Sequence, residues 1–108
     1  MIHPVLNTQM PLVIGLLKEH KIKNAYLFGS AVTDKFNDQS DVDILINFND
    51  GLEPLERGEL IMDLQIALED GLHRSVDLLT ETSMRNPYFI EDVNEKEVKI
   101  YEIAIYNK

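Results

Sequence analysis

The chain has 108 residues, 44% of them hydrophobic and 27% charged, which is typical of one globular domain. It contains no cysteine, so disulfides and thiolate metal sites are excluded. Its net charge of −9 argues against a long nucleic acid as partner, because affinity for a polyanion comes chiefly from lysine and arginine. No apolar run approaches the ~20 residues that span a bilayer, and residues 1–10 show no secretory signal, so a cytoplasmic protein is expected.

The first 36 residues are predicted to form a helix, a strand and a second, short helix. Residues 10–20 carry apolar side chains at helical spacing: Met10, Val13, Ile14 and Leu17. A short apolar run predicts a strand at residues 24–28, and residues 31–36 are expected to form the short helix. Residues 1–9 show no periodic pattern, so we expect a loosely ordered lead-in there.

A polar turn at residues 37–40 precedes a second predicted strand, residues 42–48. The polar residues 49–51 then break the chain. Pro54 suits the first position of a long helix, which is expected to end near Gly71. One face of this helix is apolar: Ile61, Leu64, Leu68 and Leu72.

The last third of the chain is predicted to add a strand, a helix and a further strand. The third strand covers residues 75–79, and Asn86-Pro87 begins a helix that runs to residue 94. Residues 98–105 fit either a strand or a continued helix, and we assign them to a strand. Helices that alternate with strands predict an α/β (α+β) domain in which helices cover a small sheet.

Two carboxylates mark the start of the second strand. Asp41 and Asp43 are two residues apart, so on a strand both side chains face the same side. Two like charges so close repel, and a bound cation is a natural reason to keep them together. Hard oxygen ligands in pairs suit Mg²⁺, which also takes oxygens from substrate phosphates. The alternative is a chance Asp-x-Asp pair in an acidic chain, with Asp41 capping the turn.

Gly29-Ser30 follows the first strand and begins the short helix. Free backbone N–H groups at such a point can bind an anion, and glycine lets a phosphate approach closely. The alternative is a plain turn with Ser30 as the helix N-cap. Ser40, ahead of the carboxylate pair, can bind the nucleotide or stabilise the turn through its hydroxyl. A phosphate cradle beside a carboxylate pair indicates phosphoryl or nucleotidyl transfer.

Together, Gly29-Ser30 and the Ser-Asp-Val-Asp segment at residues 40–43 resemble the signature of the DNA polymerase beta-type nucleotidyltransferase superfamily. The short chain is similar to its smallest branch, the minimal nucleotidyltransferases (MNT). In that family a third carboxylate stands where this chain has Asp77. Many members carry an arginine soon after the Gly-Ser pair, whereas this chain has Ala-Val-Thr at residues 31–33.

This resemblance implies a nucleotidyltransferase fold with a small mixed β-sheet. It implies that Asp41, Asp43 and Asp77 are catalytic and bind Mg²⁺, with two ions when the nucleotide is present, and that Gly29 and Ser30 bind the triphosphate. The reaction would move AMP from ATP to a hydroxyl, and Asp77 would help to deprotonate that hydroxyl. From its apolar neighbours alone, Asp77 could instead be a water-facing residue of an edge strand.

The resemblance also implies a partner. Minimal nucleotidyltransferases are similar to this chain in lacking a domain that holds the acceptor, and many are paired with a small helical HEPN protein, an RNase-type toxin. The acceptor is therefore expected on such a partner or on a second copy of the chain. Two rival functions stay open: a non-catalytic antitoxin or regulatory subunit, and a phosphohydrolase that uses the same carboxylates.

Other polar residues are less informative. Four cations could each reach a phosphate, and the sequence does not rank them: Lys35, Arg57, Arg74 and Arg85. Three histidines share no metal-ligand spacing and are expected at the surface: His3, His20 and His73.

Overall fold

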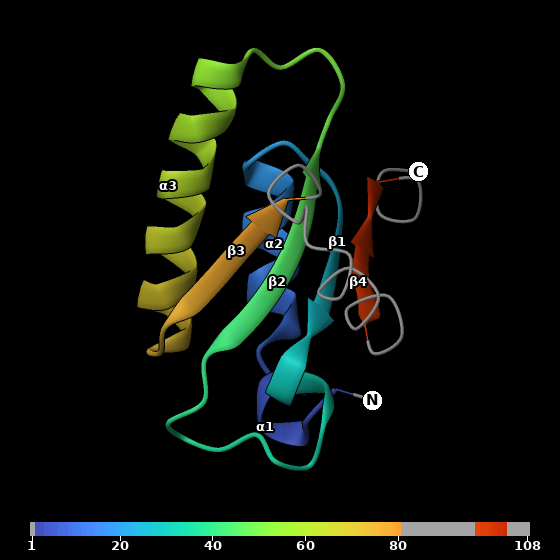
Figure 1. Ribbon diagram of the computed structural model, residues 1–108, viewed down its shortest axis with the longest axis vertical. Coiled ribbons are helices and arrows are strands. Elements are labelled where there is room, and N and C mark those ends of the chain that lie inside the picture. The colour runs from blue at the N-terminus through green and yellow to red at the C-terminus, as the bar shows by residue number, and fades with distance from the viewer. Residues whose placement is uncertain (1, 81–96, 104–108) are drawn as a thin grey trace.

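Four strands form one mixed sheet in the computed structural model, which describes residues 2–80 and 97–103 (Figure 1). The sheet order is β3-β2-β1-β4. Its strands are β1 (Ile22–Phe28), β2 (Val42–Phe48), β3 (Val76–Thr80) and β4 (Val98–Glu102). β1 pairs antiparallel with β2 and with β4, whereas β2 and β3 are parallel. The mixed sheet that the resemblance implied is therefore confirmed.

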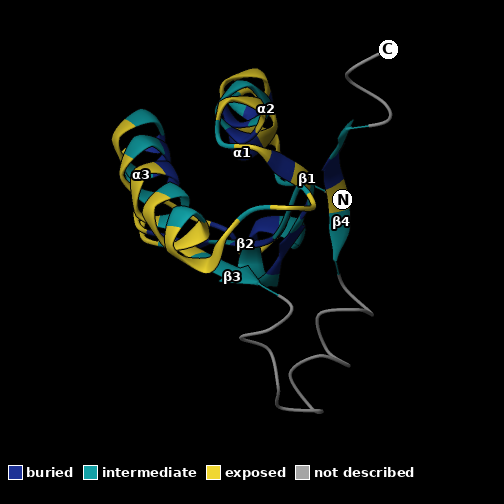
Figure 2. Ribbon diagram, turned by 90° about the horizontal axis from the view of Figure 1, so that it is seen from above, coloured by how far each residue is buried: buried dark blue, intermediate teal, exposed yellow. Residues whose placement is uncertain are grey.

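The two longer helices lie on the same side of this sheet (Figure 2). They are α2 (Met10–Glu19) and α3 (Pro54–Leu72), and a short helix, α1 (Pro4–Asn7), precedes them. α3 connects β2 to β3, which gives the parallel pair the helical crossover that such strands require. No helix within the described ranges is long and apolar enough to cross a membrane.

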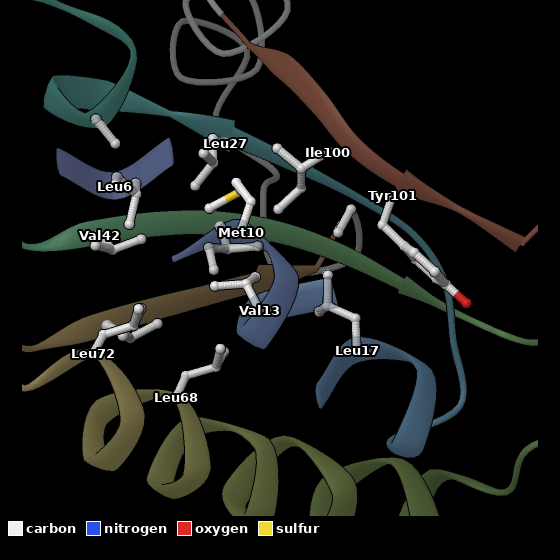
Figure 3. Close-up of a cluster of buried hydrophobic side chains, with 14 of the residues drawn as sticks. Leu6, Met10, Val13, Leu17, Leu27, Val42, Leu68, Leu72, Ile100 and Tyr101 are labelled. Carbon is white, nitrogen blue, oxygen red and sulfur yellow. The ribbon is translucent and has the colours of Figure 1, made fainter. Parts of the chain in front are cut away.

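The core fills the space between the helices and the sheet. Val13 and Leu17 of α2 and Leu68 of α3 are fully buried, and Figure 3 shows them converging on the sheet. From β2, alternate residues enter the same cluster: Val42, Ile44 and Ile46. Because a strand alternates its side chains, residues 43, 45 and 47 belong to the opposite face of the sheet.

The bounds of the two longer helices agree well with the predictions. α2 begins at Met10 as expected, and α3 begins at Pro54 and ends at Leu72. His73 follows α3 with φ 57°, the left-handed conformation that commonly ends a helix. β2 has the predicted bounds, β1 begins two residues earlier than predicted, and β3 is shifted by one residue.

Two predictions for local structure were wrong. Residues 1–9 are not a loosely ordered lead-in where the structure describes them, because α1 lies there and Leu6 is fully buried. The His3 ring caps α1 by accepting a hydrogen bond from Val5 N–H at Nδ1. The backbone N–H of His3 donates to Ala31 O. The helix predicted at residues 31–36 is instead a four-residue 3₁₀ helix, η1 (Gly29–Val32). The helix predicted at residues 86–94 lies outside the described residues.

Candidate active site

Asp43 and Asp77 are direct neighbours on adjacent parallel strands. The register of β2 and β3 pairs Asp43 with Asp77, between the pairs Val42 with Val76 and Ile44 with Leu78. Paired residues of adjacent strands lie about 4.8 Å apart at Cα and point to the same face. The carboxylates of the second and third predicted strands are thus brought together on the face of the sheet that the helices leave uncovered.

Asp41 lies just ahead of β2 and is exposed. The next residue, Val42, is attached to the segment ahead of β3, because Val42 N–H donates to Ser75 O at 3.0 Å. This hydrogen bond anchors the backbone beside Asp41. Asp41 and Asp77 both raise the pKa of Asp43 electrostatically. The charges of Asp77 and Asp41 therefore both act on the Asp43 carboxylate.

The pKa of Asp43 is raised from its usual value near 3.8 to about 6. Partial burial is the largest cause, because it disfavours the charged form, and the negative charges of Asp77 and Asp41 follow in that order. The part of this rise that follows burial, the contribution of Asp77 and Asp41, reflects repulsion between the carboxylates. A divalent cation at this point would relieve that repulsion.

Gly29 packs its backbone against the Asp43 carboxylate. Gly29 has φ 69°, a conformation that side-chain-bearing residues rarely adopt, and a Cβ placed on it would collide with Asp43 Oδ2. Phe28, just before it, is the register partner of Asp43 across β1 and β2. The sequence pattern Gly-Ser at the end of β1 therefore reflects a close approach between this turn and the carboxylate.

The two serines of the sequence motif lie at the two ends of the segment between β1 and β2. Ser30 lies in η1, and its carbonyl accepts hydrogen bonds from Thr33 N–H at 3.0 Å and from Thr33 Oγ1 at 2.9 Å. Ser40 Oγ accepts from Asn37 N–H at 3.0 Å, so the hydroxyl stabilises the turn. Because η1 is only four residues long, the helix-dipole part of the anion-site argument carries little weight here.

Of the four cations that the sequence left unranked, the structure separates two. Arg74 directs Nη1 to the carbonyls of Asn37 and Ser40, at 2.9 and 3.0 Å, and its guanidinium lies 4.4 Å from the centre of the Phe36 ring. Arg57 lines a cavity together with Asn49 and other residues around the C-terminal end of β2. Asp41 lies at the other end of that strand. The guanidinium of Arg74 thus holds a loop.

The remaining two candidate cations and the histidines add little to the site. Lys35 is exposed in the loop, and Arg85 lies outside the described residues. His20 is half-buried and His73 is exposed, so both lie at the surface as predicted. The role of Arg74 was missed because its partners are backbone carbonyls more than 30 residues away in sequence. The only sequence signal was its position directly ahead of the Ser75–Asp77 segment.

The donor set fits a magnesium ion in chemistry. Asp41, Asp43 and Asp77 offer only carboxylate oxygens, the ligands that Mg²⁺ prefers. Within residues 2–80 and 97–103, no three acidic or histidine side chains are already gathered closely enough to enclose an ion. Mg²⁺ usually takes one or two protein carboxylates and completes its shell with substrate phosphates and water, so an open arrangement suits it.

Several known proteins are similar to this chain in sequence or in structure. The family described as "Polymerase beta, Nucleotidyltransferase" matches residues 13–105. A proposed protein adenylyltransferase of Methanocaldococcus jannaschii is 36% identical over 80 residues, which cover 74% of this chain and 78% of that protein. The solved structure of a proposed minimal nucleotidyltransferase is 26% identical with a TM-score of 0.68, over 91% of this chain and 95% of that one. A crystal structure of a toxin–antitoxin with AMP-PNP is 25% identical with a TM-score of 0.67, over 86% of this chain and 73% of that one.

The fold, the three carboxylates and these similarities define the class of protein as a nucleotidyltransferase. The chain belongs to the polymerase beta nucleotidyltransferase family. Its structure is also similar to that of a proposed minimal nucleotidyltransferase, the branch that the sequence resembles.

Proposed function

We propose that this chain transfers AMP from ATP, as its magnesium complex, to a hydroxyl group of a partner protein. The observation that carries the proposal is the register of Asp43 and Asp77, which places two carboxylates side by side next to the Gly29 turn. Support for the nucleotide comes from the family, and support for the adenylyl group from the M. jannaschii relative that is 36% identical.

Each residue of the site has a proposed role in this reaction. Asp41 and Asp43 hold the metal-bound nucleotide, while Gly29 and Ser30 leave room for the triphosphate at the end of β1. Asp77, exposed on the neighbouring strand, accepts the proton of the attacking hydroxyl and completes the metal site. Bound Mg²⁺, one or two ions, would supply electrostatic stabilisation of the phosphate oxygens.

The bonds that change are those of an ordinary nucleotidyl transfer. The acceptor oxygen forms a bond to the α-phosphorus, and the bond from that phosphorus to the bridging oxygen of pyrophosphate breaks. Pyrophosphate leaves with the electron pair, and the hydroxyl proton passes to Asp77. The protein's contribution is positioning and electrostatics, as is general for transfer at phosphorus.

The acceptor is proposed to be a hydroxyl on a small helical toxin of the HEPN type, most plausibly a tyrosine. The similarity to a toxin–antitoxin that was crystallised with AMP-PNP, an ATP analogue, supports this choice. The net charge of −9 also disfavours a nucleic acid acceptor. AMP on such a toxin would add charge and bulk, and could silence it directly.

A labelling experiment tests the transfer. The wild-type chain is incubated with Mg²⁺, ATP labelled at the α-phosphate and a HEPN-type toxin, sought as the product of the neighbouring gene, next to Asp41→Asn and Asp43→Asn variants. Label on the toxin with the wild type alone supports the proposal. No label, with tight binding of the toxin by all three chains, would favour a non-catalytic antitoxin that acts by complex formation.

A further inference from the structure

Arg74 joins the two segments of chain that deliver the site carboxylates. It lies two residues after Leu72, the last residue of α3, and three residues ahead of Asp77. Its Nη1 donates to Asn37 O at 2.9 Å and to Ser40 O at 3.0 Å. Ser40 is the residue directly before Asp41. One side chain therefore spans from the entry of β3 to the loop that ends at Asp41.

The loop between η1 and β2 has mostly local support of its own. Asn37 N–H donates to Ser40 Oγ, Gln39 N–H to Asn37 Oδ1, and Ser40 N–H to Asn37 O, all at 2.8–3.0 Å. These bonds close a tight turn, but they do not attach it to the sheet. Arg74 makes such an attachment, and Val42 N–H to Ser75 O makes a second one immediately after Asp41.

An aromatic ring fixes the guanidinium between these partners. Phe36 is buried, and the Arg74 guanidinium lies 4.4 Å from its ring centre, within the range of a cation–π contact. His3 packs against the same ring, with 5.3 Å between ring centres. The planar group is thus held in one orientation while a single nitrogen donates two hydrogen bonds. A lysine ammonium, a point charge on a flexible stem, cannot reproduce both features.

We propose that Arg74 is a positioning residue, which orders the loop 37–40 so that Asp41 stays beside Asp43 and Asp77 for binding of the metal–nucleotide. This inference rests on the proposed function, because it assigns Asp41 a role in holding the nucleotide. It also gives Nη1 of Arg74 a structural task, since this nitrogen is engaged with backbone carbonyls and is not available to a triphosphate. Placement of catalytic groups to within a fraction of an ångström strongly affects binding and rate.

The test uses two readouts on the full chain, amide hydrogen exchange and Mn²⁺–ATP binding. The variants are Arg74→Lys, which keeps the charge, and Arg74→Met, which keeps the apolar stem. The matched control is Lys23→Met, which removes an exposed cation near the far end of the sheet, where Lys23 lies 3.8 Å from Asp50. Exchange is followed by NMR at Ser40 N–H, with the amides of β2 as the internal reference.

Loss of the two hydrogen bonds is expected to speed exchange at Ser40 about tenfold or more and to weaken Mn²⁺–ATP binding about tenfold, because hydrogen bonds from charged donors are stronger than those from neutral donors. Both Arg74 variants should show these effects at a temperature where circular dichroism finds them folded, and Lys23→Met should show neither. If Arg74→Met fails to fold, Arg74→Lys carries the test.

Two outcomes overturn the inference. Unchanged exchange at Ser40 in a folded Arg74 variant means that this side chain does not order the loop. Faster exchange with wild-type affinity for Mn²⁺–ATP means that loop order does not matter to the site. Failure of the wild type to bind Mn²⁺–ATP would instead overturn the proposed function, and the exchange measurement alone would then decide whether Arg74 orders the loop.

Discussion

Gly29 and Asp43 are in such close contact that no side chain fits on residue 29. A Cβ there would collide with Asp43 Oδ2, and the backbone of Gly29 has φ 69°. Two independent reasons, space and conformation, therefore require glycine at this position. The contact also means that the turn after β1 and the carboxylate of β2 cannot move independently.

Gly29→Ala is therefore predicted to destabilise the chain and disturb the site. The strained backbone alone costs about 1–3 kcal/mol. Displacement of the Asp43 carboxylate should in addition weaken Mn²⁺–ATP binding. Urea unfolding and a binding titration measure the two effects.

Gly15→Ala is the matched control for that change. Gly15 lies within α2, and no atom comes within 4 Å of a Cβ placed on it. Alanine there should stabilise the helix by about 0.5–1 kcal/mol and leave nucleotide binding unchanged. A stable Gly29→Ala chain with wild-type binding would contradict the close contact that the structure shows.

Metal-free stability should depend on pH through Asp43. Its pKa is about 6 in the folded chain against 3.8 in its usual state, so the folded state holds this proton more tightly than the unfolded state. The contribution of Asp43 to stability is therefore favourable below pH 4 and is lost as the pH rises to about 6. Asp43→Asn removes the charge while it keeps the shape, and should be more stable than the wild type at pH 7 by about 1 kcal/mol, allowing for screening of a partly exposed group.

Thermal melts without divalent metal, at pH 4 and pH 7, measure this difference. The melting temperature of Asp43→Asn relative to that of the wild type should rise from pH 4 to pH 7. Asp63→Asn, an exposed acid on α3, controls for the loss of one charge from an acidic chain. An Asp43→Asn chain that melts well below the wild type at pH 7 would show that Asp43 is a structural residue and not one of a repelling pair.

Asp77 is predicted to differ in role from the other two carboxylates. Asp77→Ala should reduce turnover strongly but leave Mg²⁺–ATP binding measurable, because Asp41 and Asp43 still hold the nucleotide. Isothermal titration calorimetry and a single-turnover assay separate the two properties. Equal loss of binding in the Asp41, Asp43 and Asp77 variants would mean that Asp77 is simply a further ligand of the same ion.

Much of the fold was predictable because it follows from local patterns. The apolar face of α3 and the proline at its start indicated its bounds, and the apolar run after the polar turn indicated β2. The fold of residues 1–9 was not predictable, because a four-residue helix that buries one leucine, Leu6, has no periodicity to detect. The helix expected at residues 31–36 is absent, since the chain leaves η1 at Thr33 in an extended conformation, φ −131° and ψ 170°.

The site was predictable only in part. The spacing of Asp41 and Asp43 at the start of β2 can be read from the sequence, and the family resemblance suggested Asp77. The alignment of Asp77 with Asp43 depends on the register of two strands that are separated by the whole of α3. The hydrogen bonds from Arg74 to the loop likewise depend on the tertiary structure, so periodicity and spacing could not reveal them.

The central claim is that this chain attaches AMP to a hydroxyl of a partner protein, and intact-mass spectrometry of the partner tests it most directly. A HEPN-type toxin, sought as the product of the neighbouring gene, is incubated with ATP, Mg²⁺ and either the wild type or Asp41→Asn. We expect a mass increase of one or more AMP groups with the wild type and none with the variant. An unmodified toxin in both reactions, while the wild type binds Mg²⁺–ATP and the toxin, would contradict it.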